Sequence, residues 1–195
     1  MPAIKQTNAI YLTIADGKIC RRVQTKTPDA IERLTKDNKL VYEEFYKGWK
    51  GTITDIQTRE NDYGKNWMIH LTDEFGSYIL QLPYSSGYSA AFLKALPNLD
   101  PSQPVTIMPS LKIEGDKKKT SIFLNQNGQS IKWAYTKDNP NGIPELKQIK
   151  VKGKTTWDDS DIMEFLENMV NNEFLPKLNS GSQNTSDENL DEVPF

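Results

Sequence analysis

Hydrophobic and polar residues alternate in five short runs between residues 39 and 135. A period of two is typical of β-strands with one buried face. Between the third and fourth runs, residues 85–96 place Phe92, Leu93 and Leu96 three and four positions apart, which predicts a helix. The five runs are GWKGTITDIQ, NWMIHLTD, GSYILQLPY, PVTIMPSLKIE and KTSIFLNQN. Because this is the element order of an OB-fold, we predict a mainly β, five-stranded barrel.

The first predicted strand covers residues 41–58 and is expected to be long and bent, because Gly48 and Gly51 interrupt it. If Ile53 points into the barrel, Trp49 shares its side. The reverse assignment would place Trp49 on the surface, and the alternation alone is compatible with both.

The residues before the barrel, 1–38, are expected to form an extension. Residues 7–26 alternate around Asp16-Gly17, a strong turn signal, and predict a β-hairpin. A lone hairpin is only marginally stable, so it must pack on the barrel or on a second subunit; contact with nucleic acid is an alternative role. Residues 27–34 start with Thr-Pro-Asp and predict a short helix.

The residues after the fifth strand divide into three parts. Residues 131–135 predict one more short strand. The barrel domain is expected to extend to residue 157. Residues 158–176 carry apolar side chains at helical spacing, opposite an acidic face, and Pro176 is expected to end this helix. The helix therefore packs on the barrel or on a partner. Residues 177–195 have the composition of a flexible linker and tail.

Composition argues against several kinds of site. The chain has one cysteine, Cys20, and one histidine, His70, which excludes an internal disulfide and a zinc site of Cys and His alone. Both residues lie in strand-like runs, where packing is the commoner role. No spacing of carboxylates suggests a metal-dependent hydrolase. We therefore predict a protein that is not an enzyme, with no catalytic residues, no metal and no cofactor.

Two further patterns bear on location. No apolar run approaches the roughly 18 residues of a membrane span. The first five residues, MPAIK, lack the basic start and apolar block of a secretory signal. We interpret the protein as cytoplasmic.

Charge is divided unevenly along the chain. Residues 1–157 carry 23 Lys and Arg against 16 Asp and Glu, whereas residues 158–195 carry one lysine against 10 acidic residues. A basic body with an acidic end suits a protein that binds a polyanion and whose tail competes for the same groove. A solvated tail on an ordinary protein is the alternative interpretation.

Aromatic residues interleaved with cations suggest how a polyanion would be held. Bases of a single strand stack on aromatic faces while phosphates follow a positive groove. The candidates for stacking are Trp49, Tyr63, Trp67, Tyr78, Phe123, Trp133 and Tyr135. The candidates for phosphate contact are Lys50, Arg59, Lys65, Lys112, Lys117, Lys118 and Lys119. Since a β-rich chain must bury most of its large side chains, we expect about half of these aromatics to belong to the core.

Two loops of the predicted barrel correspond to the loops that grip nucleic acid in OB-folds. Residues 59–65 carry two cations and a tyrosine, although a plain solvated loop is the alternative. Residues 114–120 contain three successive lysines, whose mutual repulsion a polyanion relieves. A later cluster, Lys147, Lys150, Lys152 and Lys154, is either a rim that follows phosphates or a solvated strand.

The last nine residues carry a more specific signal. Asp187-Glu188 and Asp191-Glu192-Val193-Pro194-Phe195 resemble the acidic C-terminal tip of bacterial and bacteriophage single-stranded DNA-binding proteins. In that family the tip docks on replication and repair enzymes, with the terminal Phe and carboxylate in an apolar pocket that has a basic rim. This chain departs from the pattern at Asn189-Leu190, which breaks the acidic run, and at Val193, where Ile is commoner.

The resemblance implies a protein that coats and protects single-stranded DNA, without sequence choice, in replication, recombination and repair. Partner enzymes would be recruited through the tail. The N-terminal hairpin and the acidic helix resemble a bacteriophage version more than the compact bacterial tetramer, which implies the cytoplasm of a bacterial host. A homodimer or weak self-association stays open. The alternative is an OB-fold interaction module of a replisome or phage particle that does not bind DNA.

Overall fold

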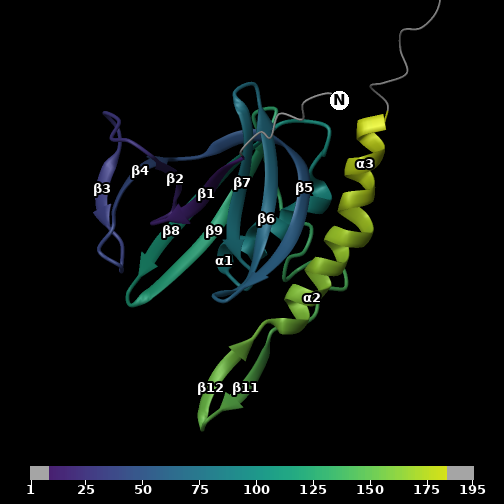
Figure 1. The fold of residues 1–195 in the computed structure, drawn as a ribbon. Coiled ribbons are helices and arrows are strands. Elements are labelled where there is room, and N and C mark those ends of the chain that lie inside the picture. Colours follow the sequence, from purple (N-terminus) through teal and green to yellow (C-terminus); the bar gives the residue numbers. More distant parts are fainter. Residues whose placement is uncertain (1–8, 184–195) are drawn as a thin grey trace, which may run out of the picture.

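The computed structural model describes residues 9–183, which form a mainly β structure with helices along one side (Figure 1). Ten of the described strands belong to one large sheet. These strands are β1 (Ile10–Ala15), β2 (Lys18–Val23), β3 (Ile31–Leu34), β4 (Leu40–Tyr46), β5 (Trp49–Asn61), β6 (Gly64–Asp73), β7 (Gly76–Pro83), β8 (Val105–Glu114), β9 (Lys117–Gln126) and β10 (Gln129–Ile131).

The other elements are a separate hairpin and two helical regions. The hairpin consists of β11 (Lys147–Val151) and β12 (Lys154–Asp158). Helix α1 (Gly87–Ala95) continues into a short 3-10 turn, Leu96–Asn98. Helix α2 (Ser160–Met169) runs through a π-helical turn, Val170–Phe174, into α3 (Leu175–Gln183).

The large sheet has the strand order β10-β9-β8-β5-β6-β7-β1-β2-β4-β3. Strand β5 pairs antiparallel with both β6 and β8, and β8 pairs antiparallel with β9. The five alternating runs of the sequence are thus β5, β6, β7, β8 and β9, and α1 lies between β7 and β8. The prediction of a mainly β domain with a helix between its third and fourth strands is confirmed.

The long first strand that we predicted is in fact two strands, β4 and β5, which turn at Gly48. A Cβ atom at Gly48 would lie 2.9 Å from the Cγ of Met108 and 3.0 Å from the carbonyl oxygen of Ile107. The chain can therefore pass this close to β8 only without a side chain. Beyond the turn, Ile53 is buried. Strand β5 therefore has the orientation in which Ile53 points inward and Trp49 shares its side, and not the reverse.

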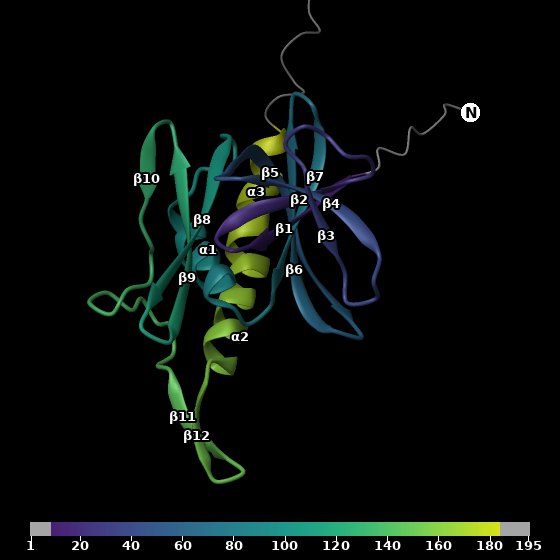
Figure 2. The same ribbon diagram turned by 90° about the vertical axis from the view of Figure 1, so that its left-hand side faces the viewer.

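The N-terminal hairpin, β1 and β2, is part of the large sheet. Asp16 and Gly17 have φ values of +49° and +71°, as a two-residue hairpin turn requires. Strand β1 pairs in parallel with β7, and a Cβ atom at Gly17 would lie 2.7 Å from the backbone nitrogen of Leu111 in β8. The hairpin therefore crosses from β7 towards β8 and packs on strands of the large sheet, which is one of the alternatives that we predicted (Figure 2).

Residues 27–34 do not form the helix that we predicted. Residues 31–34 are strand β3, which pairs antiparallel with β4 and places Ile31 opposite Glu43. The Arg33 guanidinium donates two hydrogen bonds to the carboxylate of Glu43, a side chain that is almost fully buried. The pairing of β3 with β4 and the contact between Arg33 and Glu43 outweigh the local preference of Pro28-Asp29 for a helix start.

Helix α2 packs on the sheet, which is one of the two alternatives that the apolar stripe of residues 158–176 left open. Met163 and Leu166 belong to the same core as the strands, and Phe165 contacts the ring of Tyr135 edge-on at 5.3 Å. Our prediction that Pro176 ends the helix is wrong, because α3 continues to Gln183. Proline has no N–H to donate and its ring crowds the carbonyl of the preceding turn, and the wider π-helical turn before Pro176 relieves this crowding.

Two predicted boundaries differ from those of the structure. Only residues 129–131 form β10, so residues 132–135 are not a strand. Residues 177–183, which we assigned to the linker, belong to α3. No helix of the described residues is long and apolar enough to cross a membrane.

Candidate nucleic-acid interface

Strands β5, β6 and β7 carry every second side chain on the outer face of the sheet. The rows across this face are Asp55–His70–Ile79, Gln57–Met68–Gln81 and Arg59–Asn66–Pro83. Met68 and Ile79 are only 5% and 8% exposed although they point away from the core side. The outer face therefore has an apolar floor surrounded by amide and charged side chains.

A shallow cavity of about 90 Å³ lies on this face, and we call it the sheet groove. Its lining residues are Tyr11, Arg59, Asn61, Asn66, Met68 and Gln81. Tyr11 comes from β1 and is 48% exposed, so its ring is available for contact. A ring, a thioether floor, a guanidinium and amides are groups that stack on bases, contact phosphates and bond to base edges.

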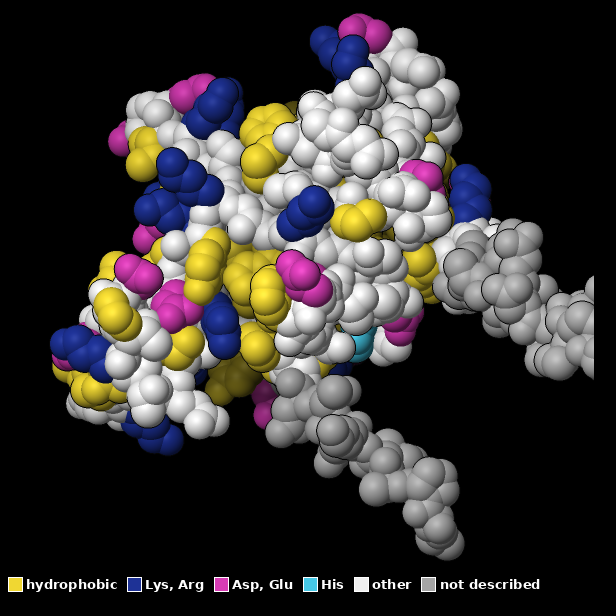
Figure 3. Space-filling view, turned by 90° about the horizontal axis from the view of Figure 1, so that it is seen from above, with side chains coloured by type: hydrophobic (Ala, Val, Ile, Leu, Met, Phe, Trp, Pro, Cys, Tyr) yellow, Lys and Arg dark blue, Asp and Glu magenta, His cyan; other side chains and the backbone are white. Residues whose placement is uncertain are grey.

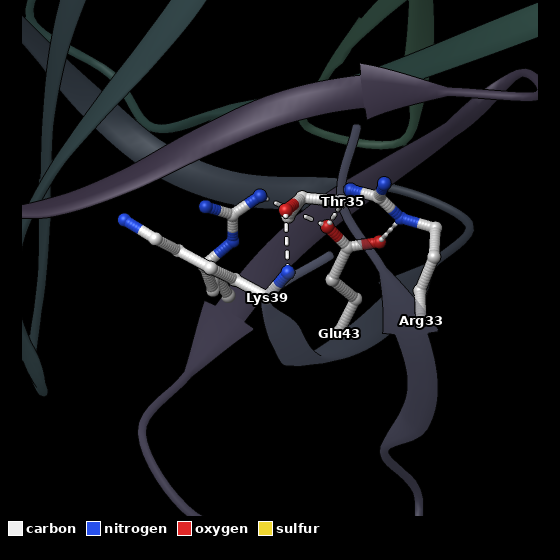
Figure 4. Close-up of polar contacts among 5 residues, drawn as sticks. Arg33, Thr35, Lys39 and Glu43 are labelled. Atoms are coloured by element: carbon white, nitrogen blue, oxygen red, sulfur yellow. Dashed lines mark hydrogen bonds and ion pairs between the residues drawn. The ribbon is translucent and has the colours of Figure 1, made fainter. Parts of the chain in front are cut away.

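Strands β2, β3 and β4 extend the same sheet face beyond Tyr11 and carry two arginines. Arg22 lies opposite Glu43 in the β2–β4 ladder, and Arg33 reaches Glu43 from β3 (Figure 4). The Nη2 atoms of Arg33 and Arg22 lie 2.6 and 3.3 Å from Oε1 of Glu43. One carboxylate thus fixes two guanidiniums, both about half exposed, and leaves one net positive charge.

The pKa of Glu43 reflects this arrangement. Hydrogen bonds from Arg33 lower it most, burial opposes them, and Arg22 adds to the lowering, so the pKa lies below that of an ordinary glutamate. The carboxylate is therefore charged at neutral pH and holds both arginines in place. Figure 4 also shows Thr35 and Lys39 in the β3–β4 turn, where the Lys39 backbone N–H donates to the Thr35 hydroxyl at 3.1 Å.

The two loops predicted to grip nucleic acid point to the same end of the molecule. The β5–β6 turn carries Tyr63, which is 98% exposed, and the β8–β9 tip carries Lys117, Lys118 and Lys119, all exposed. In Figures 1 and 2 both hairpin tips lie at the end towards which β11 and β12 project. Lys119 forms an ion pair with Glu114, which leaves Lys117 and Lys118 without a carboxylate partner among the described ion pairs.

Three aromatics that we predicted to stack on bases are core residues instead. Trp67, Tyr78 and Tyr135 are 1%, 5% and 6% exposed. Trp67 stacks on Tyr84 at 5.4 Å, and Tyr78 contacts Trp49 edge-on at 4.8 Å. Large aromatic rings stabilise the fold more when they are buried in the core than when they line an exposed groove. The prediction that these three residues stack on bases is therefore wrong.

Lys65 was predicted to contact phosphate, but it forms an ion pair with Glu167 of helix α2. Its Nζ lies 2.7 Å from Oε2 of Glu167 and 4.2 Å from the centre of the Tyr84 ring. The side chain is 35% exposed and its charge is already balanced. Lys65 therefore has no unpaired charge to offer a phosphate.

The remaining exposed candidates are not brought together. Lys50 lines a cavity of about 540 Å³ with Phe75 and Pro104, beside the β6–β7 turn. Figure 3 views that end of the molecule and shows hydrophobic side chains gathered in the middle, with Lys and Arg side chains around them. Trp133 lines a different cavity of about 630 Å³, where the Lys94 ammonium lies 5.6 Å from its ring.

Strands β8 and β9 carry the last two predicted contacts. Phe123 is 48% exposed and lies opposite Met108, and Lys112 lies opposite Lys119 near the hairpin tip. All four side chains share one face of this hairpin, because directly opposed residues in an antiparallel pair point the same way. This face adjoins the tip and not the sheet groove.

Seven residues of this interface were absent from our candidates: Tyr11, Arg22, Arg33, Asn61, Asn66, Met68 and Gln81. Alternation in β1 already placed Tyr11 opposite to the buried Leu12, so an outward aromatic was readable there. The pairing of β1 with β7, which brings Tyr11 to Met68, joins segments about seventy residues apart and leaves no local signal.

Among residues 9–183, no three His, Cys, Asp or Glu side chains group as metal ligands would. The tail residues Asp187, Glu188, Asp191, Glu192, Val193, Pro194 and Phe195 lie outside the described residues. Comparisons with protein-family models, with curated proteins and with solved structures gave no match. A functional proposal for this chain therefore rests on its own fold and residues.

Proposed function

We propose that this protein binds single-stranded DNA without choice of sequence and that strands β5 to β9 form an OB-fold. Support comes from the order β9-β8-β5-β6-β7, which in OB-fold numbering is 5-4-1-2-3, with α1 between the third and fourth strands. Proteins of this fold bind oligonucleotides on the second and third strands and with the loops 1–2 and 4–5.

The observation that carries the proposal is the position of the sheet groove. It lies on the outer face of β6 and β7, which are the second and third strands of that order, and it combines Tyr11, Met68 and Arg59. Stacking on an aromatic ring is worth about 1–3 kcal/mol per base and accepts any base. Arg22 and Arg33 continue the positive charge along the same sheet face.

The biological role that we propose follows from the tail. A chain that covers single-stranded DNA in replication, recombination or repair protects it, and an acidic tail with a terminal Pro-Phe recruits partner enzymes. Because this tail resembles those of bacteriophage and bacterial proteins, the compartment that we propose is a bacterial cytoplasm. The same acidic tail competes with DNA for the basic groove.

The test is a fluorescence titration of the full chain with oligo-dT at several salt concentrations. Base stacking near tryptophan quenches its emission, and the slope of log K against log salt is about −0.7 for each phosphate contacted. We expect quenching that weakens as salt rises, with oligo-dA bound to a comparable extent and duplex DNA much more weakly. Absence of salt-sensitive binding to every oligonucleotide would overturn the proposal.

A second candidate is an interaction module with the same fold that does not bind DNA. It is favoured by one observation, the burial of Trp67, Tyr78 and Tyr135, which removes three of seven predicted stacking residues. The titration separates the two functions, because an interaction module retains tail-dependent capture of a replication enzyme while no oligonucleotide binds.

A further inference from the structure

Strands β11 and β12 form a two-stranded hairpin that stands apart from the large sheet (Figures 1 and 2). Every side chain of β11 is exposed, and in β12 only Asp158 is half-buried. Two strands alone are marginally stable in water, so this hairpin gains little free energy of folding from its own burial. Its exposed side chains are therefore available to a ligand.

The hairpin is strongly basic. Residues 147–158 contain four lysines and one carboxylate, that of Asp158. Lys147 forms an ion pair with Asp161 of α2, which attaches the base of the hairpin to the helix. Within the part of the chain that the structure describes, Lys150, Lys152 and Lys154 take part in no ion pair. Three positive charges at the far end of the hairpin thus have no anion, which matches a polyanionic ligand.

An aromatic side chain accompanies these lysines. Trp157 is 61% exposed, an unusual state for so large an apolar side chain. Gln148 lies opposite Trp157 and Lys150 lies opposite Thr155, so Lys150 and Trp157 share one face of the hairpin. This face offers a ring for stacking and a cation for the adjoining phosphate.

The turn fixes the orientation of the tip. Lys152 and Gly153 have φ values of +49° and +80°, as in the two-residue turn that best matches the twist of paired strands. Such a turn holds the backbone of the tip in one conformation, with Lys152 in the turn and Lys154 directly after it. The tip lysines are therefore presented without a large cost in backbone entropy.

We propose that the β11–β12 hairpin is a second contact for single-stranded nucleic acid, separate from the sheet groove. The proposal rests on the proposed function. The hairpin projects from the end of the molecule where the β5–β6 and β8–β9 tips lie, so a strand that leaves the groove at this end passes it. Trp157 stacks on a base of that strand, and Lys150, on the same face, contacts the adjoining phosphate. Lys152 in the turn and Lys154, which lies opposite Val151 and points to the other face, contact further phosphates as the strand passes around the tip. Long strands use both contacts and short strands only the groove.

The first experiment removes the three charges. The triple variant Lys150→Gln, Lys152→Gln, Lys154→Gln is titrated with oligo-dT of about 8 and of about 30 nucleotides, lengths chosen against the roughly 4–16 nucleotides typical of one OB-fold. Loss of three phosphate contacts reduces the slope of log K against log salt by about 2 for the long strand and leaves the short strand unchanged. Lys18→Gln, Lys36→Gln, Lys177→Gln is the matched control, which removes three exposed charges elsewhere.

The second experiment uses Trp157. We expect Trp157→Ala to weaken binding of the long strand by about fivefold or more. Trp157→Phe retains a ring, so it restores the affinity while the fluorescence change on binding becomes smaller. A substitution that merely disturbed the fold would weaken the short strand as well.

The outcomes separate the two proposals. If the unmodified chain binds neither strand, the proposed function fails and the hairpin contact fails with it. If the unmodified chain binds both strands and the triple variant loses no more of its salt dependence than the control does, the hairpin inference alone is overturned. A triple variant that changes the oligomeric state in sedimentation, but not the binding of the long strand, also overturns it and assigns the hairpin to contact with a second copy.

Discussion

The Nζ atom of Lys65 in β6 lies 2.7 Å from Oε2 of Glu167 in α2. The same carboxylate accepts hydrogen bonds from the Tyr84 hydroxyl at 2.5 Å and from the Thr58 hydroxyl at 3.2 Å. Burial disfavours the charged form of Glu167, but these hydrogen bonds outweigh burial and the pKa lies below that of an ordinary glutamate. One carboxylate thereby fastens the C-terminal helix to two strands and to the start of the segment that leads to α1.

We expect Glu167→Gln to lower the free energy of unfolding by about 1–2 kcal/mol at pH 7, because Lys65 and Tyr84 lose a charged acceptor. In the unfolded chain the carboxyl group takes up its proton at a higher pH than in the folded chain. Its contribution is therefore complete above the unfolded pKa and is lost as pH falls through the folded pKa.

Urea unfolding between about pH 3 and pH 7 checks this, with Glu164→Gln, an exposed neighbour on the same helix, as control. The unmodified chain and the control should lose stability on acidification more steeply than Glu167→Gln. Parallel curves for all three proteins would show that the contact does not stabilise the fold.

Gly17 offers a test of how the N-terminal hairpin is attached. Its φ is +71°, and a Cβ atom there would lie 2.7 Å from the backbone nitrogen of Leu111, so Gly17→Ala introduces both left-handed strain and a backbone clash. Gly115→Ala has a similar φ of +60° and open space around it, so it measures the strain alone, about 1–2 kcal/mol. We expect a clearly larger loss at Gly17 in urea unfolding, and equal losses would contradict close packing of this turn on β8.

Much of the fold was readable from alternation because half-buried strands record which face is inside. The runs of β5 to β9 and the stripe of α1 were therefore predicted in the right order. Residues 31–34 were not, because their strand depends on pairing with β4 and on the contact between Arg33 and Glu43. Trp67 was misjudged for a related reason, since its ring is covered by Tyr84, a residue seventeen positions along the chain.

The candidate site was less predictable than the fold. Exposed loop residues such as Tyr63 and Lys118 could be named from the sequence, because loops between strands are solvated. The sheet groove depends on the parallel pairing of β1 with β7, which carries Tyr11 to the side of Met68 and Gln81. Long-range pairing of this kind follows from the whole sheet, and no short motif encodes it.

Tyr11 is the residue of the groove whose substitution should affect DNA binding most directly. We expect Tyr11→Ala to weaken binding of oligo-dT by about fivefold or more, from the loss of one stacked base. Tyr11→Phe should retain most of the affinity, because the ring and not the hydroxyl makes the contact. Phe75→Ala, which removes an aromatic ring that is 83% exposed at the other end of the strands, is the matched control. If the control weakens binding more than Tyr11→Ala, the interface lies beside the β6–β7 turn instead of in the sheet groove.

The acidic tail is tested by two truncations that separate its charge from its terminal ring. Deletion of residues 187–195 removes four carboxylates and the Pro-Phe end. Since these charges compete with phosphates for the basic face, binding of oligo-dT should become tighter at low salt and converge with that of the full chain as salt screens the competition. Capture of a replication enzyme should be lost at the same time. Deletion of Phe195 alone keeps all four carboxylates, so it should leave DNA binding unchanged and still lose enzyme capture. If the longer deletion changes neither measurement, the tail has neither of the two roles proposed for it.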